Sequence, residues 1–546
     1  MPVVSGFIVG TLVIIPTQFN ISPSVFHSSA VKGEAPRGTA AITVSNQTPT
    51  LDVSIQALVE DNPAYTQPKR NTRLTYSNPD NVSAGTKQLA SNSFNSHFGV
   101  SLSGGASRLS QLLNSGEKNY EQDIRQYSNY DIYMGQKDNG ADINIEGFTD
   151  LEYKKDASLT ITLKTKDGDT INFSLQGYKG YGKSEDSTSS IFKGIKVSFE
   201  FEGTLSEKEK KEIEAFTQNI DQLMDQLYSD SNLDLGQLDL GSLTTFSEAS
   251  LSFKPSPFGE VTDTKLELNY SDNDAQRAIN VNFLGHKSQL TIDKSSLALT
   301  ATEQQRQQSI QDYLSLLDSS AREAHAQDSA TNVLKQVFEA GFTNLVEKET
   351  DPKDLNEAQQ LHNKSLVALP DFDFSFDSKV ETPNAENRPL EYEGFALDLS
   401  MTTQINQEKD SDKVTAVQTQ KFELSAAYYT PLPGLDTVNF DEQNYQYTVL
   451  ERSSEKVTTV ESDKGEVLSA ITSEAGESNH LTLEYNMGKL KDEDSDEKKF
   501  LEVTDFIEQV KNDDLEQSQE LLNSVIIDPY SIKQAEEETT TFSITQ

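Results

Sequence analysis

A period-two alternation of apolar and polar residues begins near residue 146 and constrains the fold more than any other feature of the sequence. Such alternation places the apolar side chains on one face of a β-strand. In SLTITLKTKDGDTINFSLQ, from Ser158 to Gln176, two alternating runs flank Asp167 and Gly168. Asp-Gly favours a type I′ turn, because both central residues of that turn need positive φ. We therefore predict an antiparallel hairpin in which the acidic residues turn the chain.

Further alternating runs predict more strands in the C-terminal part of the chain. DFDFSFD, at 371–377, places its three phenylalanines on one face, and the long runs at 390–404 and 413–430 should pair as a hairpin. Four shorter runs that follow predict four more strands: YQYTVLERS, KVTTVES, EVLSAITSE and HLTLEYNM.

Apolar residues at steps of three and four predict amphipathic helices between these strands. Ser206 and Glu209 form a capping box before a helix at 206–228, and Thr300 and Glu303 form a second one. A third helix, at 330–346, contains Gly341, and EKKFLEVTDFIEQVKN at 497–512 predicts a last long helix. The expected buried residues are Ile213, Phe216, Ile220, Leu223 and Leu227 in the first helix, Ile310, Tyr313, Leu314 and Leu317 in the second, Val333, Leu334, Val337, Phe338 and Phe342 in the third, and Phe500, Val503, Phe506, Ile507 and Val510 in the last.

Together these patterns predict an α+β protein, made of antiparallel twisted β-sheets with a few amphipathic helices packed on them. We expect four segments. Residues 1–140 are rich in Ser, Asn, Thr, Gln and Pro, which predicts a loosely ordered N-terminal region with short strands and a short helix that ends at Gly116. Residues 141–295 should form a β-rich lobe with the helix 206–228, residues 296–370 a helical segment, and residues 371–546 a second β-rich lobe with C-terminal helices.

The charge and the cysteine content exclude several classes of function. The formal net charge is −41, which repels nucleic-acid backbones and anionic lipid surfaces, so we expect no nucleic-acid partner. The chain has no cysteine, which excludes disulfides, thiolate nucleophiles and Cys-ligated metal sites. An acidic surface instead fits a solvated face or a basic protein partner.

The most apolar run, FIVGTLVIIP at 7–16, is shorter than the about 20 residues that a membrane-spanning helix needs. We therefore expect no stable membrane insertion. The first basic residue is Lys32, so the run also departs from a standard signal peptide. Two compartments stay open, the cytoplasm and export without a standard signal peptide.

No sequence motif assigns catalysis or cofactor binding. The six histidines, His27, His97, His286, His325, His362 and His480, form no metal-binding or metalloprotease spacing. The nearest approach to a serine-nucleophile elbow, GVSLSGG at 99–105, has Ser103 where the second glycine belongs. GYKGYGKSED contains Gly180, Gly182 and Lys183 but lacks the first glycine of a phosphate loop, so we interpret it as a loop between strands. We predict neither catalytic nor cofactor-binding residues.

Two acidic stretches, DEDSDE from Asp492 and EKDSDK from Glu408, could hold calcium loosely, and the weak candidates for a metal site are Asp492, Asp494 and Asp496 of the first. The first stretch departs from a calcium loop of the EF-hand type at two positions, because Glu497 stands where glycine is needed and Val503 where a bidentate glutamate is needed. We interpret the stretch as a solvated loop before the last helix.

A strand, the pattern EG-x-L-x-x-x-E, a helix and a returning strand occur within 150–255, around Glu202, Gly203, Leu205 and Glu209. In this stretch the chain resembles a group of uncharacterised gammaproteobacterial proteins that share a domain of unknown function. The resemblance implies a bacterial source and implies no activity.

The leading functional hypothesis is therefore a non-enzymatic structural or interaction protein of bacterial origin, associated with a surface or an appendage. The first alternative is a cytoplasmic enzyme or regulator whose site is assembled from residues distant in sequence. The second alternative is a surface module stabilised by calcium. A deep pocket that gathers a histidine with carboxylates of shifted pKa would favour the enzyme.

Overall fold

The computed structural model describes residues 71–94, 101–129, 148–184, 189–229, 233–255, 266–296, 300–345, 352–407, 413–512 and 521–523. All of these residues belong to one compact unit, Pro68–Gln546. The N-terminal apolar run, His27 and His97 lie outside them, and so do the expected strands before residue 71.

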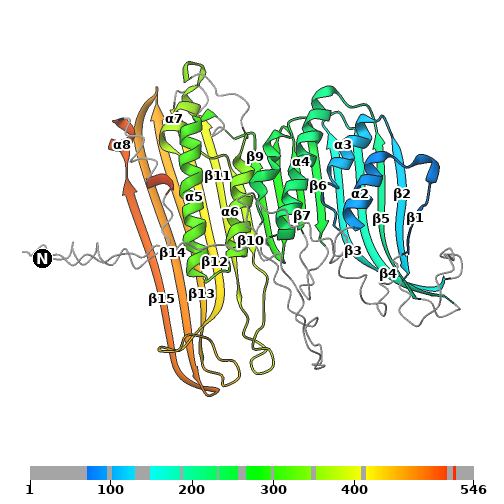
Figure 1. The fold of residues 1–546 in the computed structure, drawn as a ribbon. Coiled ribbons are helices and arrows are strands. Elements are labelled where there is room, and N and C mark those ends of the chain that lie inside the picture. Colours follow the sequence, from blue (N-terminus) through cyan, green and yellow to red (C-terminus); the bar gives the residue numbers. More distant parts are fainter. Residues whose placement is uncertain are drawn as a thin grey trace, which may run out of the picture. The chain divides into compact units, whose positions relative to one another are not determined.

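The strands form a single 15-stranded sheet, in which the pairing of every neighbouring couple is antiparallel (Figure 1). Its order is β1-β2-β5-β4-β3-β6, after which each strand pairs with the next one in sequence up to β15. The first part contains β1 (Asn71–Tyr76), β2 (Asn119–Asn129), β3 (Phe148–Thr165), β4 (Thr170–Ser184), β5 (Ser189–Glu202), β6 (Phe246–Lys254), β7 (Leu266–Asp272), β8 (Gln276–Phe283) and β9 (His286–Asp293). The second part contains β10 (Phe372–Asp377), β11 (Gly394–Gln407), β12 (Lys413–Thr430), β13 (Tyr445–Asp463), β14 (Glu466–Asn486) and β15 (Lys489–Asp505).

The helices occupy three stretches of the chain between these strands and one stretch after β15. The α-helices are α2 (Ala84–Phe94), α3 (Ser107–Asn114), α4 (Glu207–Ser229), α5 (Glu303–Glu323), α6 (Asp328–Phe342), α7 (Glu357–Ser365) and α8 (Ile507–Lys511). Short 3-10 turns lie at η2 (Pro79–Asn81), η4 (Leu235–Leu238), η5 (Leu240–Ser242) and η7 (Pro352–Asp354). The fold is therefore α+β with a mostly antiparallel sheet, as the sequence predicts.

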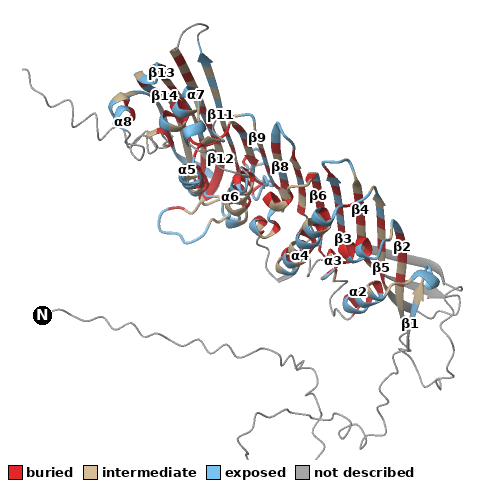
Figure 2. Ribbon diagram, turned by 90° about the horizontal axis from the view of Figure 1, so that it is seen from above, coloured by how far each residue is buried: buried red, intermediate tan, exposed pale blue. Residues whose placement is uncertain are grey.

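Helices α2 to α6 lie along the same face of the sheet (Figure 2), which we call the helix face; the opposite one is the open face. Along β10, Phe372, Phe374 and Phe376 are buried toward the helix face, whereas Asp373 and Asp377, at alternate positions, are exposed. Phe338 of α6 lies edge-on to both Phe372 and Phe374, with ring centroids 5.6 and 5.5 Å away. The alternation of DFDFSFD thus assigns one face to the core and the other to solvent.

The hairpin at Ser158–Gln176 is confirmed, and its turn differs from the prediction. β3 and β4 pair from Phe148 to Ser184, and Gly168 has φ of +97°. Asp167 does not have positive φ, so the turn is not type I′. The loop holds three residues, 166–168, since the N–H of Thr165 donates to the carbonyl of Asp169 at 3.0 Å and the N–H of Gly168 donates to the carbonyl of Thr165 at 3.1 Å. The carboxylate of Asp169 accepts a hydrogen bond from the backbone N–H of Thr204, at 3.0 Å. Asp169 thereby joins the hairpin to the start of α4.

The first predicted helix is confirmed together with its capping box. The N–H of Ser206 donates to Oε2 of Glu209 at 2.6 Å, and the N–H of Glu209 donates to Oγ of Ser206 at 3.3 Å. All the apolar residues predicted on its inner side are buried. In α5 the cap lies two residues beyond the predicted one, because Thr302 and Gln305 form the box. Thr300 instead contacts Asn363 at the end of α7.

The predicted helix at 497–512 is wrong over most of its length. Residues up to Asp505 belong to β15, which pairs with β14 from Ile471 to Asn486, and only Ile507–Lys511 are helical. Val503 is 63% exposed, whereas Phe506 and Val510 are buried as predicted. The spacing of three and four residues fits a helix, but β14 offers a complete ladder of backbone partners. Likewise the four short strands predicted after residue 445 are two long ones, β13 and β14.

The described part of the expected loosely ordered region contains β1, η2, α2, α3 and β2, and both strands join the large sheet. The helix that ends before Gly116 is confirmed as α3. Polar composition predicted loose order here, but burial of Leu102, Leu109 and Leu112 in the core orders the segment. One sheet also runs through both predicted β-rich lobes, so the four segment boundaries remain a prediction. No helix in the described ranges combines the length and apolar character needed to cross a membrane.

Candidate functional site

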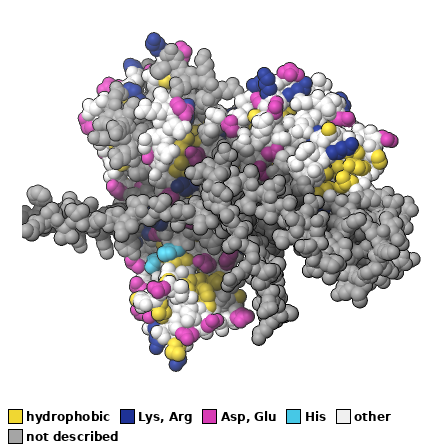
Figure 3. Space-filling view, in the orientation of Figure 1, with side chains coloured by type: hydrophobic (Ala, Val, Ile, Leu, Met, Phe, Trp, Pro, Cys, Tyr) yellow, Lys and Arg dark blue, Asp and Glu magenta, His cyan; other side chains and the backbone are white. Residues whose placement is uncertain are grey.

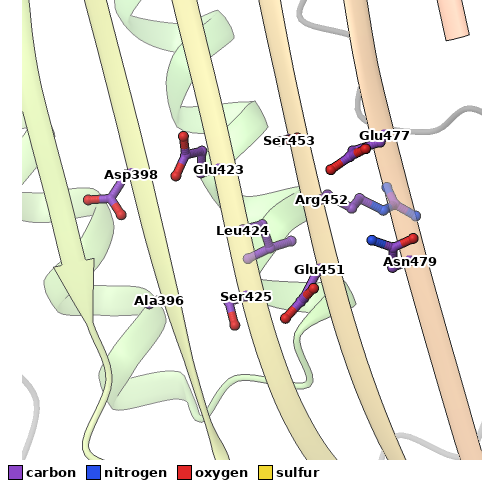
Figure 4. Close-up of a pocket in the computed structure, with 10 residues that line it drawn as sticks. All are labelled: Ala396, Asp398, Glu423, Leu424, Ser425, Glu451, Arg452, Ser453, Glu477 and Asn479. Atoms are coloured by element: carbon purple, nitrogen blue, oxygen red, sulfur yellow. The ribbon is translucent and has the colours of Figure 1, made fainter. Parts of the chain in front are cut away.

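A hollow of about 250 Å³ lies over four neighbouring strands, β11 to β14 (Figure 4). Most of its side chains come from alternate positions whose register places them on the open face. The lining residues are Ala396, Asp398, Glu423, Leu424, Ser425, Glu451, Arg452, Ser453, Glu477 and Asn479. We call this feature the acidic hollow.

The register of the sheet brings the carboxylates of the acidic hollow together. Asp398 of β11 lies directly opposite Glu423 of β12, and Ser425 lies opposite Glu451 of β13. Directly opposite residues have Cβ atoms about 5 Å apart, and diagonal neighbours about 7 Å. Three acidic side chains from three strands therefore share one small area of the sheet.

These carboxylates lack compensating charge. Burial, followed by the charges of Asp377 and Glu423, raises the pKa of the Asp398 carboxyl. Within the described ranges no ion pair reaches Asp398, Glu423 or Glu451. Like charges directly opposite each other destabilise a sheet. The acidic hollow therefore carries an excess of negative charge.

Two basic residues of the described ranges lie at the hollow, and neither forms an ion pair with Asp398, Glu423 or Glu451. Arg452 lines it, but its guanidinium pairs with Glu323 of α5 on the helix face. Lys499 of β15 lies 3.8 Å from Glu477 and 2.9 Å from Glu497. On the part of the surface that Figure 3 shows in colour, acidic and basic side chains are interspersed. The local excess of acid is thus a property of β11–β13.

Asp492, Asp494 and Asp496, the candidates for a calcium site, lie on β15 and not in a loop. Successive residues on one face of a strand are about 7 Å apart, so three acids at steps of two cannot converge on one ion. Asp496 forms an ion pair of 3.0 Å with Lys498. In the part of the chain that the structure describes, no three His, Cys, Asp or Glu residues are grouped so that they could hold a metal.

The glycine-rich stretch with Gly180, Gly182 and Lys183 also differs from the prediction. It belongs to strand β4, which pairs with β3 on one side and with β5 on the other. Its backbone N–H groups take part in the hydrogen bonding between the strands, so they cannot surround a phosphate. The interpretation as a loop between strands is wrong.

A second hollow gathers two histidines with two carboxylates, which is the arrangement that would favour an enzyme. His286 and His325 line it together with Glu381 and Glu393, which face each other across an isolated bridge. Burial and the charge of Glu381 raise the pKa of Glu393, and burial and Lys379 lower the pKa of His286. Sequence reasoning could not find this group, because its members come from four separate segments.

Hydrogen bonding in this second hollow does not suit nucleophilic catalysis. The N–H of Lys379 donates to Nδ1 of His286 at 3.0 Å, so the neutral ring carries its proton on Nε2. Nε2 lies 3.3 Å from Oγ of Ser329 and donates to it. A general base would have to accept the serine proton instead. The volume, about 30 Å³, admits about two water molecules.

The other described histidines have structural surroundings. His325 stacks on Tyr428 with ring centroids 4.2 Å apart, and His362 is fully buried, which lowers its pKa to about 4. His480 lies within strand β14. Neither His362 nor His480 lines one of the two hollows.

Comparison with protein-family models, with curated proteins and with solved structures finds no match to this chain. The resemblance at 150–255 therefore stays a prediction.

Proposed function

We propose that this chain is a non-enzymatic interaction protein of bacterial origin whose open sheet face binds a basic protein partner. The acidic hollow carries the proposal: Asp398, Glu423 and Glu451 are adjacent on three strands and have no ion pair within the described ranges. A lysine or arginine side chain in the hollow would supply the missing charge. Charge-assisted hydrogen bonds to carboxylates are among the strong ones in proteins.

The rest of the open face supports a contact role. The positions that face it on the central strands are mostly short and polar, as in Ser250, Ser252, Asn269, Asn280 and Gln289. Such side chains donate and accept hydrogen bonds and lose little conformational freedom when a partner covers them. We also infer that the sheet is twisted, because antiparallel strands twist in one sense. We further infer that the helices are amphipathic and cover the helix face with their apolar sides.

A role at a surface or on an appendage is part of the same proposal. Its support is the cysteine-free, Ser/Thr/Asn/Asp-rich and β-rich character of the chain, which is an argument by analogy. Immunoblotting of fractionated host cells tests it. Protein in the medium or in shed appendages agrees with the proposal, and protein confined to the cytoplasm contradicts it.

Partner capture tests the binding role directly. Purified full-length chain is used as bait in a host lysate, beside a variant with Asp398→Asn, Glu423→Gln and Glu451→Gln. A matched control removes three exposed acids elsewhere, Asp436, Asp441 and Glu442. The proposal requires a basic protein that binds the wild type and the control and is lost, at physiological salt, with the hollow variant. Equal retention by all three baits rejects the acidic hollow as the site.

Two further outcomes separate the alternatives. If calcium raises the melting temperature of the wild type and not of the hollow variant, the acidic hollow binds a cation, and the calcium alternative is favoured over the protein partner. The enzyme alternative draws its support from the hollow with His286, Glu381 and Glu393, which must open before a substrate can enter it. A ligand whose binding is abolished by Glu393→Gln and unaffected by the triple variant would favour that alternative.

A further inference from the structure

Strand β15, residues Lys489–Asp505, is the last strand of the sheet. Only β14 pairs with it among the described residues, so its outer edge presents a row of backbone N–H and C=O groups. Such an edge is a template for another strand unless charge, proline or a covering segment blocks it.

Charged side chains protect only the first part of this edge from pairing with another strand. In 489–499, nine of the eleven residues are charged, whereas in 500–505 only Glu502 and Asp505 are. Leu501 is 70% exposed and Val503 is 63% exposed, and both face the open side of the sheet. Ile471 of β14, opposite Asp505, is 38% exposed and extends the apolar area. Residues 499–505 of β15 are called the self-pairing edge below.

We propose that two copies of this chain pair through their self-pairing edges, antiparallel and with Glu502 on the two-fold axis. In this register Leu501 lies opposite Val503 of the second copy, and Val503 lies opposite Leu501. Lys499 lies opposite Asp505 of the second copy at both ends, and Phe500 lies opposite Thr504. The stretch KFLEVTD is therefore complementary to its own reverse in both apolar and charged positions.

The geometry of β-pairing selects this register. Pairing of odd with odd positions keeps the open faces of both copies on the same side, so the two sheets become one continuous sheet. A slip of one residue would place the open face of one copy beside the helix face of the other. A slip of two residues, toward the N-terminus, would place Glu497 opposite Asp505. Only the proposed register pairs Leu501 with Val503.

Two electrostatic terms oppose the pairing. Glu502 meets Glu502 of the second copy, and each chain carries a net charge of −41. At about 0.15 M salt, charges more than about 8 Å apart are largely screened, so the overall repulsion is reduced while the contacts at the edge remain. Replacement of Glu502 by Gln removes the like-charge pair and should tighten the dimer.

The other edge of the sheet, β1, supplies the competing arrangement. β15 of one copy against β1 of the next would be head-to-tail and would give open chains instead of closed dimers. β1 covers only six residues, Asn71–Tyr76, and does not reproduce the charge match of the self-pairing edge. This inference goes beyond the proposed function and does not depend on what binds the open face.

Sedimentation equilibrium of the full-length chain at 0.15 M salt tests the proposal. We expect a monomer–dimer equilibrium, a dissociation constant at least tenfold higher for Leu501→Glu, and a lower one for Glu502→Gln. Leu390→Glu is the matched control, because Leu390 is 93% exposed and belongs to the segment before β11, outside the self-pairing edge. Thermal melting shows whether each variant is folded. A monomer at all concentrations, or assemblies larger than a dimer, overturns the proposal.

A charge swap tests the register independently of the apolar pair. Lys499→Asp alone places two aspartates opposite each other, and Asp505→Lys alone places two lysines there, so each single variant should weaken the dimer. The double variant restores both opposite-charge pairs and should recover most of the wild-type affinity. Asp505 also accepts a hydrogen bond from the N–H of Ile507 at 3.0 Å, so melting of each variant checks α8. A double variant no tighter than the weaker single variant refutes this register.

Discussion

The hydroxyl of Tyr445 donates a hydrogen bond of 2.9 Å to Oε2 of Glu391, and both side chains are buried. Nδ2 of Asn384 donates to the same hydroxyl at 2.8 Å. Tyr445 belongs to β13, whereas Asn384 and Glu391 belong to the segment between β10 and β11. One phenol thus fastens that segment to the sheet, beside the rings of Tyr429 and Tyr485.

Removal of this hydroxyl should cost stability without opening a cavity. Tyr445→Phe keeps the ring and removes one donor from a buried carboxylate, so we expect a loss of about 1 to 3 kcal/mol. Urea unfolding measures it. Tyr392→Phe is the control, because Tyr392 is 37% exposed, and its change should stay within about 0.5 kcal/mol. A loss no larger than that of the control would contradict the role of Tyr445.

Lys456 makes the stability depend on pH in the alkaline range. Burial lowers its pKa to about 8, against the opposing charges of Glu474 and Glu502, and its amine donates to the backbone carbonyls of Leu521 and Leu522. Between pH 8 and about 10.4 the unfolded chain holds a proton that the folded chain has lost. Stability therefore rises with pH in this window, by up to about 1.4 kcal/mol per pH unit from this residue.

Lys456→Met isolates that contribution, because methionine has a similar length and does not titrate. The difference in unfolding free energy between wild type and variant, followed from pH 7 to 10, should change in favour of the wild type as the pH rises. A difference that is constant over this range would show that Lys456 is not the titrating group.

Gly341 is required by close packing of α6 on β9. A Cβ at this position would lie 2.2 Å from Cδ2 of Leu290 and 3.2 Å from Cδ1 of Ile292. Gly341→Ala should therefore lower stability by about 1 to 3 kcal/mol, although alanine favours a helix. Glu339→Ala, on the exposed side of α6, should be nearly neutral. If Leu290→Ala does not reduce the cost of Gly341→Ala in the double variant, the contact is not the cause.

Two phenylalanines that the sequence placed in equivalent helical stripes should respond differently. Phe216 in α4 is 1% exposed, and its replacement by alanine should cost about 3 to 5 kcal/mol. Phe500 lies on the edge strand over Gly476, and its replacement should cost clearly less. Chemical denaturation of both variants checks the order. Equal losses would place Phe500 in the core, as the sequence predicted.

Asp398 should destabilise the folded chain at neutral pH. Its pKa is raised in the folded state, so its contribution favours folding at low pH and is lost as the pH rises through the folded pKa. Asp398→Asn should therefore raise stability at pH 7 by a few tenths to about 1 kcal/mol, and by less at pH 4.5 or at high salt. Asp436→Asn serves as the exposed control. A destabilised Asp398→Asn protein at pH 7 would contradict the inference that Asp398 lacks a compensating positive charge.

Local patterns were sufficient wherever neighbours in sequence supply the partners. The capping box of Ser206 and Glu209, the buried stripe of α4 and the alternation of Phe372, Phe374 and Phe376 each depend on a few adjacent residues. The cap of α5 shows the limit, because Thr300 and Thr302 both fit the pattern. Only the contact of Thr300 with Asn363 of α7 separates them.

The candidate site could not be found from the sequence. Asp398, Glu423 and Glu451 occupy ordinary solvent-facing positions of three different strands, and nothing near any one of them indicates the others. The one available signal was an acid at a polar position within an alternating run, which dozens of residues in this chain share. Their proximity is created by the register of β11, β12 and β13.

By itself the sequence determined the class of the fold, the faces of most strands and helices, and the strong negative charge, because alternation, helical spacing and composition act over short range. Tertiary structure alone decided that one sheet runs from β1 to β15 and that Phe500 and Val503 belong to a strand. It also decided which acids are neighbours. Hydrogen bonds between distant strands set those choices, since residues 497–505 fit either a helix or a strand until β14 supplies their backbone partners.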